Sequence, residues 1–87
     1  MEKIKQLISN DNPLAAIRLL EEYIEKNESD DKAWFLLGKA HHKLGNIRIA
    51  INCYLKAIEI NPNSPAQEAY NMTIRILDFY NKDMYNQ

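Results

Sequence analysis

Residues 31–64 read DKAWFLLGKAHHKLGNIRIAINCYLKAIEINPNS, and this stretch decides the fold. Residues spaced three and four apart lie on one face of an α-helix. The first part of the stretch has such a stripe, made of Trp34, Leu37, Gly38 and His41. The second part has another, made of Ile47, Ala50, Ile51, Tyr54, Ala57 and Ile58. Gly45 separates the two stripes because glycine takes a left-handed backbone without a steric penalty, and Pro62 ends the second.

The side chains of this stretch also predict how its two helices pack. Gly38 and Ala50 are small, so the helix axes can approach closely where these residues meet. We expect Trp34 and Tyr54 to fill the space beside that contact, with Trp34 substantially buried. Asp30 stands where its carboxylate can cap the first helix.

The same pattern recurs one period earlier in the chain. Ala16 aligns with Ala50 at a shift of 34 residues, and Pro13 stands at a favourable first-turn position. A short apolar stripe precedes this helix, and a longer one follows Ser64-Pro65. The sequence therefore predicts an all-α protein with five helices, at residues 2–9, 13–26, 31–44, 47–60 and 65–82.

The spacing within residues 31–64 resembles one full tetratricopeptide repeat, a helix–turn–helix unit of about 34 residues. The residues that carry the resemblance are Trp34, Leu37, Gly38, Ala50, Tyr54, Ala57 and Pro62. The resemblance implies a right-handed array of antiparallel helix pairs. We expect a single domain over 1–87, with a first repeat at 1–30, a second at 31–64, and a C-terminal helix and tail at 65–87.

Composition excludes several classes of function. The formal net charge of −1 gives no general attraction to nucleic acid or to an anionic membrane. The single cysteine, Cys53, rules out an internal disulfide, and no run of about 18 apolar residues predicts a membrane span. The first residues lack the apolar run of a signal peptide, so we expect a cytoplasmic protein.

Few residues are suited to catalysis or to metal binding. His41 and His42 are adjacent, which places them about 100° apart on a helix, so they do not form an i, i+4 metal pair. We expect His41 to be structural and Cys53 to be inert packing, because nothing in the sequence places a base beside that thiol. We therefore expect no enzyme activity, no metal and no cofactor.

The resemblance also implies where a ligand binds. In the family, the first helix of each repeat lines the concave side of the array. That surface corresponds here to Lys5, Lys32, Phe35, Lys39, His42 and Lys43. These residues predict a basic groove with an exposed Phe35 at its middle, which would bind an acidic peptide or protein segment. The alternative is that the lysines only solubilise the helix and that Phe35 packs on a neighbour.

Members of the family that clamp the C-terminal carboxylates of chaperones use lysine, asparagine and arginine at five positions. The corresponding residues here are Met1, Lys5, Leu36, Ala66 and Tyr70. These residues do not reproduce that set, which argues against a chaperone-tail clamp.

The last helix is more apolar than one packed face requires. Its apolar residues span roughly 220° of the helical wheel, whereas one packed face needs little more than 100°. This excess favours an alternative function, self-assembly as a homodimer through the last helix. The interface residues that we expect are Tyr70, Ile74, Phe79 and Tyr80.

Overall fold

The structure is a computed structural model that describes the backbone of residues 2–85 and the side chains of residues 2–79. Within residues 2–85 the regular structure is entirely helical, which confirms the predicted all-α class. The elements are α1 (Glu2–Ser9), α2 (Pro13–Lys26), α3 (Asp31–Lys43), α4 (Ile47–Ile60) and α5 (Ala66–Tyr85). None of them combines the length and apolar character that a bilayer-spanning helix needs.

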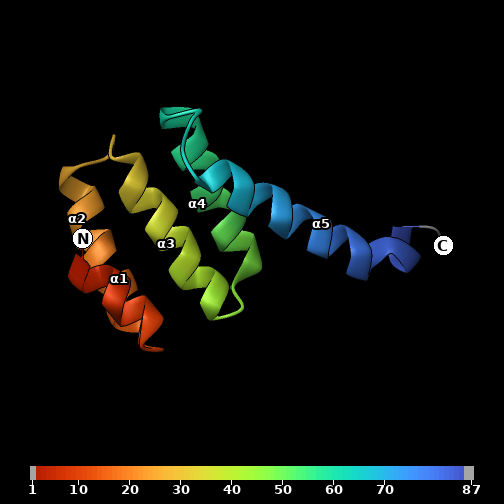
Figure 1. Ribbon diagram of the computed structural model, residues 1–87, viewed down its shortest axis with the longest axis horizontal. Helices are drawn as coiled ribbons and strands as arrows, with labels where there is room; N and C mark the ends of the chain where they lie inside the picture. The colour runs from red at the N-terminus through yellow and green to blue at the C-terminus, as the bar shows by residue number, and fades with distance from the viewer. Residues whose placement is uncertain (1, 86–87) are drawn as a thin grey trace.

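The helices stack in chain order (Figure 1). The pair α1 and α2 packs on α3, which pairs with α4, and α5 packs on α4. The second half of α5 continues beyond the other four helices, as Figure 1 shows. The molecule is therefore elongated, with extents of 44 × 28 × 18 Å.

Both turns inside the helix pairs have the same hydrogen bonds. After α3, Gly45 has φ 84°, its N–H donates to the His42 carbonyl, and the N–H of Asn46 donates to the His41 carbonyl. After α1, Asp11 has φ 61° and closes the chain in the same way, 34 residues earlier. This is the Schellman arrangement, which satisfies the last carbonyls of a helix and normally uses glycine. It ends α3 at Lys43, one residue before the predicted boundary.

Side-chain oxygens at the starts of α3 and α5 accept backbone hydrogen bonds, as predicted for Asp30. The Asp30 carboxylate accepts hydrogen bonds from the backbone N–H groups of Lys32 and Ala33, at 3.0 and 3.4 Å. The Tyr23 hydroxyl donates to the other oxygen of Asp30 at 2.6 Å, which attaches α2 to the start of α3. The Ser64 hydroxyl oxygen accepts a hydrogen bond from the N–H of Ala66 at the start of α5. This helix starts one residue after the predicted position and ends three residues beyond the predicted end.

The core consists of two clusters. The first lies among α1, α2 and α3 and includes Leu20 and the thiol of Cys53 from α4. The second is smaller, and its buried residues are Ala50, Tyr54, Ala57 and Ala66. Trp34 and Phe35 pack against both clusters, so they join the first helix pair to the rest of the molecule. Trp34 is only partly buried, less than the sequence predicts, and its indole N–H donates to the Glu28 carbonyl.

The predicted close crossing of α3 and α4 is confirmed. Gly38 lies under the ring of Tyr54, and a Cβ atom at Gly38 would be 2.5 Å from Tyr54 Cε1 and 3.2 Å from the Ala50 carbonyl oxygen. Tyr54 is 2% exposed and Ala50 is fully buried. The absence of a side chain at Gly38 is therefore what admits the tyrosine ring.

Candidate binding groove

Two adjoining hollows lie along the face that α1, α3 and α5 line, where the sequence predicts a groove. The first, the Lys32 hollow, has a volume of about 280 Å³. Its walls are Lys5, Asp31, Lys32, Phe35, Leu36, Asn61 and Pro65. The second, the His42 hollow, measures about 330 Å³ and lies between α3 and α5. Its walls are Phe35, Lys39, His42, Tyr54, Pro65, Glu68, Ala69, Met72 and Thr73. Phe35 and Pro65 belong to both hollows, so the two are continuous.

Phe35 is not the exposed anchor that the sequence predicts. It is partly buried, it packs against both core clusters, and its ring centroid lies 6.2 Å from that of Tyr54. Most of the Phe35 side chain therefore packs on its neighbours, as the alternative interpretation predicts. The remaining surface forms the ridge between the two hollows, and the ammonium of Lys39 lies 5.5 Å from its ring centroid. A cation in this position is attracted to the ring face, so Lys39 has a preferred place beside the ridge.

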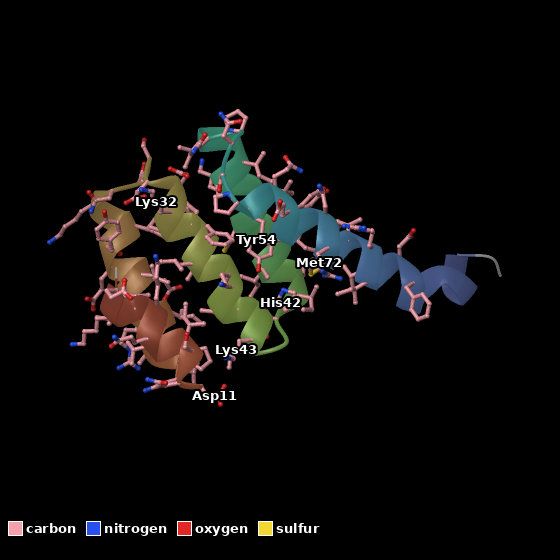
Figure 2. All side chains as sticks on the ribbon, viewed as in Figure 1. Asp11, Lys32, His42, Lys43, Tyr54 and Met72 are labelled. Atoms are coloured by element: carbon pink, nitrogen blue, oxygen red, sulfur yellow. The ribbon has the colours of Figure 1, made fainter. Side chains whose placement is uncertain are left out.

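Lys43 lines a shallow hollow together with Lys39, His42 and Tyr54, and its ammonium also makes a structural contact. Its ammonium donates to the Ile8 carbonyl at 3.0 Å and lies 3.3 Å from the Asp11 carboxylate. Ile8 is in the last turn of α1, where the helix dipole favours a positive charge. Lys43 therefore joins α3 to the turn of the first helix pair. Figure 2 shows Lys43 and Asp11 together at that end of the molecule.

Acidic side chains also line the groove, so it is less basic than the sequence predicts. Asp31 lies in the Lys32 hollow, where its carboxylate accepts a hydrogen bond from the Asn61 side chain at 3.2 Å. Glu68 lies in the His42 hollow. The lysines left at the edges of the two hollows are Lys5, Lys32 and Lys39, and all three are exposed.

His42 faces the groove, as predicted, and contacts the core through Tyr54. The Tyr54 hydroxyl lies 3.5 Å from Nδ1 of His42, the outer limit of a hydrogen bond. Burial raises the pKa of Tyr54 to about 12, so the phenol stays protonated at neutral pH. Figure 2 shows His42 on α3 close to Met72 on the neighbouring α5. The two side chains line the same hollow.

The predicted interface residues of α5 lie on different sides of that helix. Tyr70 packs against the second core cluster, Ile74 is 37% exposed and Phe79 is 75% exposed. The Tyr80 side chain lies outside the described residues. Met72 and Ile76 were not among the predicted site residues, although they are 59% and 44% exposed. Their four-residue spacing was a usable signal, but only the direction in which α5 packs tells which edge of its apolar arc is covered.

Of the residues that correspond to the chaperone-tail clamp, Lys5 is exposed at the edge of the Lys32 hollow. Leu36 and Ala66 are buried apolar residues and Tyr70 packs on the core, while Met1 lies outside the described residues.

The groups considered for catalysis have structural environments. Cys53 is 5% exposed, and burial raises the pKa of its thiol to about 11, which keeps it protonated and unreactive at neutral pH. His41 contacts the side chain of Asn46 through Nδ1 at 3.3 Å. Among the described residues, no three or more histidine, cysteine, aspartate or glutamate side chains are grouped so as to hold a metal ion.

Comparison with known proteins agrees with this architecture. Residues 31–64 match the sequence model of the tetratricopeptide repeat family. A solution NMR structure of the Bacteroides fragilis protein BF1650 is similar over 99% of this chain and 88% of that one, with 46% sequence identity and a TM-score of 0.87. A search of the curated proteins finds no match. The chain belongs to the tetratricopeptide repeat family, whose members generally mediate protein–protein interactions without catalysis.

Proposed function

We propose that the protein is a non-catalytic interaction module that binds a peptide or protein segment in the groove lined by α1, α3 and α5. The observation that supports this proposal is the pair of continuous hollows, with lysines at their edges and Phe35 between them. In this proposal the whole chain acts as one cytoplasmic domain. Residues 1–30 and 31–64 are its repeats, and residues 65–87 are its final helix and tail.

The lining of the hollows indicates the kind of segment that fits. Leu36 and Pro65 in one hollow, and Ala69 and Met72 in the other, favour apolar side chains of the ligand. Lys5, Lys32 and Lys39 favour carboxylates beside those side chains. Asp31 and Glu68 oppose that preference locally, so the preference for acidic ligands is modest and weakens as salt rises, with screening over about 8 Å at physiological ionic strength.

The proposal can be tested by selecting binders from a displayed library of random peptides of about 15 residues, a length that spans roughly 20 Å as a helix. We expect the selected peptides to be enriched in aspartate and glutamate. The double variant Lys32→Ala/Lys39→Ala should weaken their binding roughly three- to tenfold, since exposed charge pairs contribute up to about 1 kcal/mol each.

The matched control is Lys26→Ala/Lys56→Ala, which removes the same charge from exposed positions on α2 and α4. This control should change the affinity by no more than about twofold, a change no larger than that expected from a weak exposed ion pair. A library that yields no binders, or binders equally affected by both double variants, would show that this groove is not the binding surface. Lys43 is excluded from the test because its contacts with α1 affect folding.

A second candidate function is homodimerisation through α5. The observation that favours it is the exposure of Ile74, which lies one turn from Tyr70 on the edge of α5 that points away from the groove. Ile74 and Ile76 are about 160° apart around the helix, so this edge is distinct from the groove side. A two-fold dimer would pair this edge with its own copy. Sedimentation of the wild type and of Ile74→Glu tests this candidate, and a monomeric wild type at high micromolar concentration would exclude it.

A further inference from the structure

Met72 connects the groove to a third hollow. It lines the His42 hollow together with Lys39 and His42, and it also lines an open, shallow hollow on the surface of α5, where the other described lining residues are Arg75, Ile76 and Phe79. We call this third space the Ile76 hollow. Because one side chain belongs to both, the groove does not end where α3 ends. It continues along the part of α5 that extends beyond the other helices (Figure 1).

The exposed side chains along this continuation form one stripe. Met72, Ile76 and Phe79 are spaced four and three residues apart, which places them within about 60° of one another on the helix. The stripe is about 10 Å long, from the rise of 1.5 Å per residue. It lies away from the packed face of α5, where Ala66 and Thr73 are buried. The groove thus has a basic part on α1 and α3 and an apolar part on α5.

We propose, on the basis of the binding function above, that the ligand is an amphipathic helical segment of another protein, with its apolar side on the Met72–Ile76–Phe79 stripe and its acidic side toward α3. A helix is the occupant that fits because residues spaced three and four apart on α5 match the same spacing on a partner helix. An extended strand places its side chains at a period of two and fits this stripe less well.

Charge determines which amphipathic helix fits. Lys39 lies beside the Met72 end of the stripe, and Arg75 flanks the stripe itself. Neither forms a salt bridge to another side chain among the described residues. Glu68 lies at the opposite, Pro65 end of the His42 hollow, about two turns of α5 from Arg75. A ligand helix with carboxylates along the flank that faces Lys39 and Arg75 would therefore be favoured over one with lysines there.

The peptides selected from the library test this inference directly. Their apolar residues should recur at spacings of three and four, and their circular dichroism should become helical when the protein is added. The variant Ile76→Glu should weaken their binding roughly tenfold or more, because the ligand would then cover a carboxylate, close to its own acidic flank, in place of an aliphatic side chain. The matched control is Ile49→Glu on α4, where the isoleucine is 45% exposed against 44% for Ile76, so a general effect of the substitution would appear in both.

The outcomes separate this inference from the proposed function. Peptides that lose affinity with Lys32→Ala/Lys39→Ala but bind Ile76→Glu as tightly as wild type would leave the groove in place and overturn the role of α5. Peptides that bind in an extended conformation would overturn the helical ligand. If the unliganded protein sediments as a dimer that Ile76→Glu dissociates, a second copy covers the stripe and the inference is wrong. Circular dichroism of each variant alone shows that it is folded.

Discussion

The two helix pairs share one backbone plan, yet they fill their crossings with different side chains. In the second pair Tyr54 lies on Gly38, with Ala50 beside them. At the matching positions 34 residues earlier, the first pair has Leu20, Ile4 and Ala16. The second pair thus combines a large aromatic ring with a glycine, whereas the first pair combines two aliphatic side chains of medium size. The comparison teaches that the crossing requires a total volume, which different residues can supply.

The first prediction converts one crossing into the other and has the largest expected effect. Gly38→Ile alone should destabilise the protein by about 3 kcal/mol or more, because even its Cβ would overlap the Tyr54 ring. Adding Tyr54→Leu reproduces the residue pair of the first crossing. The double variant should then be more stable than the sum of the single effects predicts, by at least about 1 kcal/mol. Urea denaturation of the four proteins measures this, and strict additivity would show that the two crossings are not equivalent.

The second prediction concerns the contact between the pairs. Trp34 packs against both core clusters, so Trp34→Ala should reduce the free energy of unfolding by roughly 2–3 kcal/mol, less than a fully buried tryptophan would lose. Trp34→Phe keeps a smaller aromatic ring and removes the hydrogen bond to the Glu28 carbonyl with part of the packing, so it should cost less than Trp34→Ala, roughly 1–2 kcal/mol. Denaturation monitored by far-ultraviolet circular dichroism compares them. Equal losses would show that the ring retained by phenylalanine contributes no stabilising contact between the clusters.

The third prediction uses the titration of a group on α4 that packs against the first cluster. Burial raises the pKa of Cys53 from its ordinary value of 9.0 to about 11, so the folded protein favours the neutral thiol. This stabilisation is complete below pH 9 and is lost as the pH rises to 11, because the unfolded chain ionises first. At a pH one unit above the ordinary value, the loss should be roughly 1 kcal/mol. Cys53→Ala should lack this component of the alkaline destabilisation, and an unchanged pH profile would contradict the assignment.

The smallest expected effects are at the two matching turns. Asp11 and Gly45 both have positive φ, where glycine is favoured. Gly45→Asp should cost about 1 kcal/mol in thermal or urea unfolding. Asp11→Gly relieves a similar backbone strain but loses the ion pair with Lys43, so the free energy of unfolding should change by no more than about 0.5 kcal/mol. Asp11→Asn removes only the charge, and it should therefore be less stable than Asp11→Gly.

The comparison of the pairs also explains how much could be predicted from the sequence. The five helices follow from local signals, such as the Asp30 cap, Gly45 and the apolar spacing, and their bounds agree within three residues. The Gly38 crossing was predictable because glycine is unfavourable inside a helix, so its presence there indicates that a neighbouring helix approaches closely. The first pair lacks that signal, and its similarity emerges mainly from the shared turn geometry.

The site was less predictable because its properties arise between elements. Lys43 belongs to the groove stripe by spacing, but its ammonium contacts the Ile8 carbonyl, 35 residues away. Phe35 has a groove position, yet its ring packs against residues of α4 and α5 that its own helix does not specify. Met72 became a groove residue only once the direction of α5 was known. Local periodicity identifies a face of a helix, while the neighbours of that face are determined by tertiary packing.

The single thiol of the chain can report how often the folded structure opens locally. Cys53 is the one cysteine of the chain, and it is buried where α4 meets the cluster of the first pair. A thiol reagent can reach it only when the array opens at that joint, so the rate of labelling at neutral pH measures how often α4 separates from the first two helices. Ligand occupancy of the groove would slow that rate without any engineered probe, because a segment bound against both α1 and α5 contacts helices on the two sides of the joint.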